Sequence, residues 1–310
     1  MDVVKLKPAV KDYIWGGNKL FKWGKFSSKP VIAESWELSF HPDGLSLIDG
    51  GNYDGLPLKE VASKEDLGNR INDFPFFPLL VKLIDAKENL SIQVHPSDDY
   101  ALKNEHSFGK TEMWYVLEAE ENAGLYVGFK KDENINDVEK SLKDGTLLEK
   151  LNFFKVKKGD MYFIEAGTIH AIGKGVTLIE IQQSSNLTYR LYDYDRVDKN
   201  GNKRELHIDK ALNVINLKKY NPIIFSNNVL AECKYFISSL GDSSMKELRA
   251  FGDSFITFTI IEGEGKVNDI DCKKGDTFFI PANKKAEFKG VFSFIYSRIW
   301  KMIEIWMCCY

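Results

Sequence analysis

The segment VKKGDMYFIEAGTIHAI, residues 156–172, has a near copy in CKKGDTFFIPANKKAEF, residues 272–288. Both copies begin with KKGD, continue into an apolar run typical of a strand, and pass through a turn of small residues into another strand. The first copy carries His170 after its turn, whereas the second copy has no histidine. The repeat therefore predicts two related β barrels, one with a polar site and one without.

Short runs rich in Val, Ile, Phe, Tyr and Thr recur along the chain between Gly, Asn, Asp and Pro residues. Several of them alternate, which is the period of a half-buried strand. Dense short strands with frequent turns favour a β-sandwich or a jelly-roll barrel. The clearest runs are PLLVKLID (78–85), LSIQVH (90–95), EMWYVLEA (112–119), GLYVGF (124–129), DMYFIEA (160–166), VTLIEIQQ (176–183), FITFTIIEG (255–263) and DTFFIPA (276–282).

A few helices are expected among these strands. Ser97 is a good N-cap for a helix over 97–105, and two acidic residues follow it in the first turn. Apolar spacing near three and four residues predicts helix over 134–154, broken at Gly145. Residues 207–217 are a third candidate helix, which ends shortly before Asn221-Pro222. With the last helix as a connection, we predict a first domain over residues 1–220 and a second domain over 221–310.

Composition excludes several classes of partner. Of the 310 residues, 44% are hydrophobic and 28% are charged, which is typical of a soluble globular protein. The net charge of −3 favours neither nucleic acid nor an anionic membrane surface. The N-terminal MDVVKLKPAV does not resemble a signal peptide, and no apolar run is long enough to span a bilayer.

Cysteine usage indicates a reducing, cytoplasmic environment. None of the four cysteines, Cys233, Cys272, Cys308 and Cys309, belongs to a CxxC pair, and the first half of the chain has none. We therefore expect neither a disulfide framework nor a cysteine zinc site.

Candidate metal ligands begin in LSIQVHPSDDYA, residues 90–101. Residues two apart on a strand share a face, so Gln93 and His95 project together while Ile92 and Val94 face the other way. Two neutral donors side by side suit half of a metal site, although polar residues on a wet face of a sheet give the same pattern.

Two further residues can complete such a site. Glu112 begins the strand run after GKT, and His170 follows the turn in EAGTIHAIG. Two imidazoles, a carboxylate and an amide oxygen suit Zn²⁺ with an open position, and they also suit other divalent metals. A single histidine on a strand is more often an ordinary hydrogen-bonded residue, so the prediction depends on all four occurring together.

Six stretches match one known family and appear in that family's order: ESWELS (34–39), FFPLLVKLIDAKENLSIQVHPSDDYA (76–101), GKTEMWYVLEA (109–119), VKKGDMYFIEAGTIHAIGKG (156–175), EIQQSSNLTYRLYDYDR (180–196) and RELHIDKAL (204–212). On these stretches the chain resembles the type I mannose-6-phosphate isomerases (phosphomannose isomerases) of the short bacterial form. This resemblance implies two cupin-type jelly-roll barrels, one catalytic Zn²⁺, and interconversion of mannose 6-phosphate and fructose 6-phosphate. It implies the metal ligands Gln93, His95, Glu112 and His170, and an active-site role for Arg190.

The implied reaction moves a proton between C1 and C2 through a cis-enediol, which needs a base and a cation. Arg190 is always protonated and so suits the stabilisation of oxygen charge. Glu180 and Lys110 are both candidates for the base, and the sequence does not choose between them. An acid paired with a cation is the ordinary role for Glu180, and a solvated loop residue is the ordinary role for Lys110.

The resemblance also implies that Lys82 and Ser91 hold the substrate phosphate. Lys82 lies on an otherwise apolar strand, and Ser91 shares the face of Gln93. An outward-facing lysine on an alternating strand is the alternative for Lys82.

Two alternatives to a mannose-6-phosphate isomerase are a non-catalytic cupin that senses a sugar phosphate and a different metal-dependent enzyme, such as another sugar isomerase. Arg190 and Glu180 argue against a sensor, which needs no proton-transfer group. The segment 291–310 does not resemble the family's closing strand. The sequence leaves open whether the protein is a monomer or a homodimer.

Overall fold

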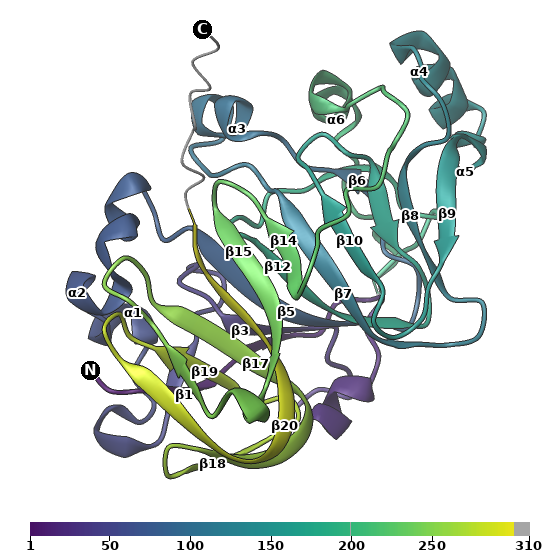
Figure 1. Cartoon of the computed structure of the whole chain (residues 1–310). Coiled ribbons are helices and arrows are strands. Elements are labelled where there is room, and N and C mark those ends of the chain that lie inside the picture. Colours follow the sequence, from purple (N-terminus) through teal and green to yellow (C-terminus); the bar gives the residue numbers. More distant parts are fainter. Residues whose placement is uncertain (199, 301–310) are drawn as a thin grey trace, which may run out of the picture. The chain divides into compact units, whose positions relative to one another are not determined.

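The computed structural model describes residues 1–198 and 200–300, which form a mainly β protein with few helices (Figure 1). This confirms the predicted fold class. The chain divides into two compact units. The site unit consists of residues 8–46 and 80–224, and the C-terminal unit consists of residues 1–7, 47–79 and the chain from Phe225 onward. No helix of the described residues is long and apolar enough to cross a membrane.

In the described part of the site unit, two antiparallel sheets provide the frame. The six-stranded sheet has the order β10-β7-β12-β5-β3-β2, and the five-stranded sheet has the order β13-β6-β11-β8-β9. The first contains β2 (Ala9–Lys11), β3 (Glu34–Leu38), β5 (Leu79–Ala86), β7 (Glu112–Ala119), β10 (Met161–Ile164) and β12 (Val176–Gln183). The second contains β6 (Ile92–Val94), β8 (Gly124–Phe129), β9 (Leu151–Lys155), β11 (His170–Ile172) and β13 (Tyr189–Tyr192).

Apolar side chains on both faces of the five-stranded sheet explain which residues point inward. Leu125 and Val127 pack in one core with Trp114 and Val116 of the six-stranded sheet. In another cluster, Ile92 and Val94 of β6 and residues of β11 and β13 pack with residues of the helices. Because Gln93 and His95 alternate with these two residues, their side chains point away from the helices. The sequence prediction for this strand is thereby confirmed.

The α-helices in the described part of the site unit agree with the predictions except at one end. They are α3 (Asp98–Asn104), α4 (Ile135–Lys143), α5 (Leu147–Lys150) and α6 (Ile208–Val214), and Gly145 separates α4 from α5 at φ +71°. The predicted helix over 134–154 was wrong at its end, because Leu151–Lys155 forms β9. Pairing with the edge of β8, from Gly124 opposite Lys155 to Phe129 opposite Leu151, replaces the helical hydrogen bonds.

The C-terminal unit holds a nine-stranded sheet among its described residues, with the order β14-β15-β20-β17-β19-β1-β4. In addition, β16 pairs with β20 and β18 pairs with β17. Its strands are β1 (Val4–Lys7), β4 (Leu47–Asp49), β14 (Val229–Glu232), β15 (Phe236–Asp242), β16 (Glu247–Arg249), β17 (Ile256–Val267), β18 (Ile270–Lys273), β19 (Thr277–Ile280) and β20 (Lys285–Ile299). Two short helices, α1 (Leu58–Val61) and α2 (Lys64–Leu67), belong to the same unit.

This unit is discontinuous in sequence because β1 pairs with both β19 and β4. The predicted boundary between residues 220 and 221 stays a prediction. Residues 291–299 of the divergent segment lie in β20, which pairs with β15 and β17, and residues 301–310 lie outside the described residues. Cys308 and Cys309 lie outside the described residues.

The two KKGD turns have the same hydrogen bonds. Asp160 Oδ2 accepts from the amide of Lys157 at 2.9 Å, and Asp276 Oδ2 accepts from the amide of Lys273 at 2.9 Å. The two turn glycines, at φ +95° and +92°, donate to Val116 and Ile260 respectively, both at 2.9 Å. The sequence repeat is therefore a repeat of backbone structure, in which each residue of the first copy matches the residue 116 positions later.

Gly159 tests the importance of this turn. Among the described residues, a Cβ at Gly159 would meet Tyr115 Oη alone, at 3.9 Å, so Gly159→Ala adds backbone strain at φ +95° without a collision there. We expect its free energy of unfolding in urea to fall by about 1–2 kcal/mol. Lys158→Ala is the control, because Lys158 is exposed at the same turn and its substitution keeps the glycine. Equal stability of the two variants would contradict the role of the turn.

Candidate active site and metal centre

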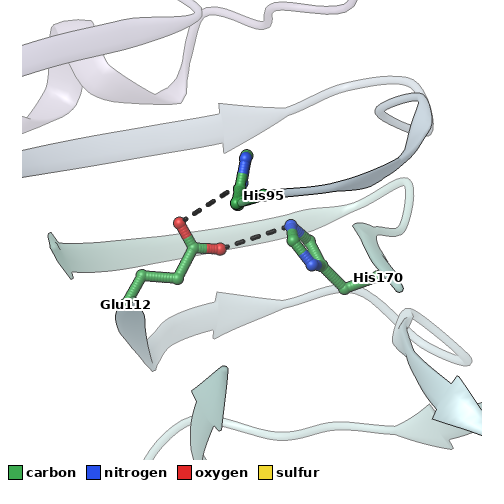
Figure 2. Close-up of side chains that lie close together, drawn as sticks. All are labelled: His95, Glu112 and His170. Carbon is green, nitrogen blue, oxygen red and sulfur yellow. Dashed lines mark ion pairs between the residues drawn. The ribbon is translucent and has the colours of Figure 1, made fainter. Parts of the chain in front are cut away.

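Three side chains from different strands meet inside the site unit. His95 follows β6, Glu112 begins β7 and His170 begins β11. Their ligand atoms all lie within 4.8 Å of one another, and the three residues are buried. Figure 2 shows the Glu112 carboxylate facing both rings, with Oε2 3.7 Å from His95 Nε2 and Oε1 3.4 Å from His170 Nε2.

Backbone carbonyls fix the tautomer of each imidazole. His95 Nδ1 donates to the carbonyl of Leu187 at 2.8 Å, and His170 Nδ1 donates to the carbonyl of Thr168 at 2.8 Å. Since a carbonyl only accepts, each Nδ1 carries the proton and each Nε2 keeps a lone pair. Burial holds the pKa of His95 well below its usual value and lowers the pKa of His170 to about 4. Two neutral, oriented imidazoles are what metal ligation requires.

Glu112 is fully buried, and burial, reinforced by the charge of Glu180, raises its pKa to about 8. Lys110 Nζ forms an ion pair with Oε2 at 2.7 Å, but among the described residues neither carboxylate oxygen accepts a hydrogen bond of favourable geometry. Gln93 reaches the same centre, with Nε2 3.3 Å from His170 Nε2. A buried carboxylate with unsatisfied oxygens, two imidazole lone pairs and an amide fit a divalent cation.

Lys110 links this centre to a second group of charges. Its Nζ lies 3.2 Å from His95 Nε2 and 3.5 Å from Glu180 Oε1. Lys82 Nζ lies 3.4 Å from the same Glu180 oxygen and 3.6 Å from Glu34 Oε2. The neighbouring strands β7, β12, β5 and β3 supply Glu112, Glu180, Lys82 and Glu34. Opposite charges alternate because Lys110, from the loop before β7, lies between Glu112 and Glu180.

Two buried tryptophans complete this row of charges. Trp114 Nε1 donates to Glu180 Oε2 at 2.9 Å, and Trp36 Nε1 donates to Glu34 Oε2 at 2.7 Å. Burial alone would raise the pKa of Glu180, but the charges of Lys110 and Lys82 outweigh it and lower that pKa to about 2. Glu180 is therefore ionised and tightly held at neutral pH.

A cavity of about 200 Å³ opens beside the metal centre. Six of the residues predicted from the sequence line it: Lys82, Ser91, Gln93, Lys110, Glu180 and Arg190. His95, Glu112 and His170 do not line it, but they contact Gln93 and Lys110, which do. The structure thus brings all nine predicted site residues to one place.

Several residues that line the cavity were not predicted from the sequence: Tyr13, Trp15, Glu34, Asn186, Thr188 and Arg204. Glu34 opens ESWELS and Arg204 opens RELHIDKAL, so the family resemblance was a signal for both. Asp193 holds Arg204, accepting from its Nε at 2.8 Å and its Nη2 at 2.5 Å. Arg190, opposite Gln93 in the ladder between β13 and β6, has a buried Nε with no hydrogen-bond partner among the described residues.

The matching positions of the C-terminal unit are apolar. The sequence repeat matches His170 with Ala286 and Ile164 with Ile280. Strand pairing then matches Glu112, the partner of Ile164, with Ile256, the partner of Ile280. Leu248 pairs with Ala286 as Gln93 pairs with His170, so Gln93 and His95 match Leu248 and Ala250. All four apolar residues belong to one buried cluster: Leu248, Ala250, Ile256 and Ala286. The same four positions therefore converge in both units, with polar side chains in one and an apolar core in the other.

Removing Lys82 tests the energetics of the buried charges. Lys82→Met leaves Glu34 and Glu180 buried without their shared cation, so we expect the free energy of unfolding to fall by about 3 kcal/mol. Lys174→Met is the matched control, because it breaks the exposed pair with Glu88 at 3.2 Å. Its expected cost is below about 1 kcal/mol in the same urea titration. Similar losses for both variants would contradict this account of the charge row.

Comparison with known proteins agrees with the site. A model of the type I phosphomannose isomerase catalytic domain matches residues 3–127. YvyI of Bacillus subtilis is 37% identical over 315 residues, which cover 95% of this chain and 98% of that protein. The mannose-6-phosphate isomerase of Streptococcus mutans is 34% identical over 307 residues, which cover 92% of this chain and 94% of that protein. The crystal structure of the Bacillus subtilis mannose 6-phosphate isomerase has a TM-score of 0.85 at 35% identity and covers 96% of this chain and 99% of that one. The chain belongs to the type I phosphomannose isomerase family.

Proposed function

We propose that this protein is a metal-dependent isomerase that interconverts mannose 6-phosphate and fructose 6-phosphate. The observation that carries the proposal is the buried centre of His95, Glu112 and His170 beside a cavity lined by lysine and arginine. The relatives that carry an activity in their names are mannose-6-phosphate isomerases, so a sugar-phosphate sensor or another sugar isomerase is not favoured. A cytoplasmic location and the oligomeric state stay predictions.

The family is metal-dependent, and we propose one Zn²⁺ per chain. Gln93, His95, Glu112 and His170 would hold it, with Nε2 of each histidine as a ligand atom. The amide oxygen of Gln93, which accepts from Ser91 Oγ at 3.3 Å, would turn toward the ion. When bound, the ion supplies a Lewis acid that polarises substrate oxygens and stabilises an enediolate. The carbonyls of Leu187 and Thr168 keep both imidazoles oriented for this purpose.

We assign proton transfer to Lys110 rather than to Glu180 because of the groups that each side chain contacts. Glu180 faces two ammonium groups and Trp114, and its pKa of about 2 makes it a weak base. Lys110 lines the cavity and contacts both His95 and Glu112. Acting in its neutral form, the Lys110 amine would take the proton from C2 of the aldose and return it to C1. The hydroxyl proton would pass from O2 to O1, and Glu180 would orient the amine.

The cations of the cavity divide between the reacting oxygens and the phosphate. Arg190 is half-buried and carries an unsatisfied Nε, so it suits stabilisation of the charge that develops on oxygen. We propose Lys82 and Ser91 as phosphate-binding residues, together with Arg204. The positive charge of Lys82 is already balanced by Glu34 and Glu180, so a second cation is required for a phosphate dianion.

The function is tested by supplying mannose 6-phosphate and detecting fructose 6-phosphate through a coupled assay, before and after treatment with a chelator. We expect turnover that the chelator abolishes and Zn²⁺ restores. In His95→Ala and His170→Ala, bound zinc and turnover should fall together, whereas His106→Ala, which changes an exposed histidine, should keep both. Full turnover in the metal-free protein, or full zinc content in either ligand variant, would refute the assignment.

Arg190 is tested separately from the metal. Because its proposed contact forms mainly with the charged enediolate, Arg190→Ala should keep the zinc and lose about 10²-fold in kcat. Arg249→Ala removes an exposed arginine of the C-terminal unit and should leave kcat unchanged. A wild-type kcat in Arg190→Ala would remove its proposed role.

A further inference from the structure

The loop that carries Lys110 into the cavity, Phe108–Thr111, is held by two side chains that do not line the cavity. Gln183 ends β12, and Asp98 begins α3. We propose that Gln183 and Asp98 are positioning residues for the isomerisation, which bridge across this loop and set the place of the Lys110 amine. The inference rests on the function proposed for Lys110 and assigns the residues through which its position is fixed.

The bridge consists of three hydrogen bonds. Gln183 Oε1 accepts from the amide of Thr111 at 2.9 Å, and Gln183 Nε2 donates to Asp98 Oδ1 at 2.8 Å. The same Oδ1 accepts from the amide of Gly109 at 2.9 Å. The amides on both sides of Lys110 are therefore held through one pair of side chains.

The rest of the loop is equally constrained. The amide of Lys110 donates to the carbonyl of Pro96 at 3.0 Å, and Ser185 Oγ donates to the carbonyl of Phe108 at 2.9 Å. A Cβ on Gly109 would lie 2.5–2.6 Å from backbone atoms of residues 96–98, so the loop packs directly against the chain that follows His95. Three successive amides of the loop thus have fixed partners, and two of those partners belong to the bridge.

This arrangement connects the segments on which the chemistry depends. Asp98 follows His95 by three residues, and Thr111 directly precedes Glu112. The buried side chain of Gln183 connects Asp98 to Thr111. Lys110 Nζ contacts Glu112 at 2.7 Å and His95 at 3.2 Å, so a shift of its backbone changes both contacts. A displacement of about 1 Å in a reacting group costs on the order of 10²-fold in rate. The bridge therefore acts on kcat through Lys110 rather than on substrate binding.

Gln183→Leu removes both hydrogen bonds of Gln183 in the bridge and leaves a shorter apolar side chain at this buried position. We expect at least a ~10-fold loss of kcat with KM within about twofold of wild type and with full zinc content. Hydrogen exchange should quicken at the amides of Gly109 and Thr111 and stay unchanged in α4. Asp160→Asn is the matched control, since Asp160 also accepts a loop amide in the same unit but lies outside the cavity lining. It should keep the wild-type kcat.

Exchanging the carboxylate and the amide between positions 98 and 183 distinguishes a positioning role from a loss of general stability. Gln183→Glu places a carboxylate against Asp98 and should lose kcat as Gln183→Leu does. The double variant Q183E/D98N restores one charge and one amide in the reverse order, so it should recover most of the lost kcat. Failure of this recovery, or wild-type kcat and exchange in Gln183→Leu, would overturn the proposal.

A double-mutant cycle that combines Gln183→Leu with Lys110→Met tests whether Gln183 affects kcat through Lys110. If Gln183 acts through Lys110, adding Gln183→Leu to Lys110→Met lowers kcat no further, although exchange at Thr111 still quickens. A further drop comparable to that of Gln183→Leu alone would show that Gln183 acts by another route. A wild-type rate in Lys110→Met would instead refute the function proposed for Lys110. The two failures can be told apart, because amide hydrogen exchange at Gly109 and Thr111 tests the bridge without any measurement of turnover.

Discussion

A buried carboxylate that faces two neutral imidazoles is the constraint on which the site depends. Burial raises the pKa of Glu112 to about 8, so its ionised form needs positive charge nearby. Lys110 provides part of that charge from one side. The lone pairs of His95 and His170 remain directed at the same space, since their other nitrogens donate to backbone carbonyls. This balance suits a divalent cation, and the surrounding charges follow from it.

The order of strands in the six-stranded sheet extends this balance away from the metal centre. Neighbouring strands supply Glu112, Glu180, Lys82 and Glu34 in turn, and Lys110 enters from the loop before β7. Lys110 lies between Glu112 and Glu180, and Lys82 lies between Glu180 and Glu34, so Glu180 can stay ionised while buried. The C-terminal unit shows the alternative solution: where its matching positions are Leu248, Ala250, Ile256 and Ala286, an apolar cluster fills the same part of the barrel.

Much of this was predictable from local pattern. Alternation and β-branched residues located the strands, and the KKGD repeat indicated two related barrels. The polar residues on strand faces gave the candidate ligands. The end of the helix over 134–154 was wrong because pairing of β9 with β8 outweighed helical periodicity. The unit boundaries and the bridge from Gln183 to Asp98 depend on contacts between segments far apart in sequence, which no local pattern encodes.

The central claim is that four side chains hold one ion, and anomalous scattering at the zinc edge tests it most directly. In crystals of the zinc-loaded protein, we predict one strong peak per chain at about 2.0–2.3 Å from Nε2 of His95, Nε2 of His170 and a Glu112 oxygen. The Gln93 amide oxygen should face the same peak. A zinc peak elsewhere in the chain, with none between these residues, would contradict the account.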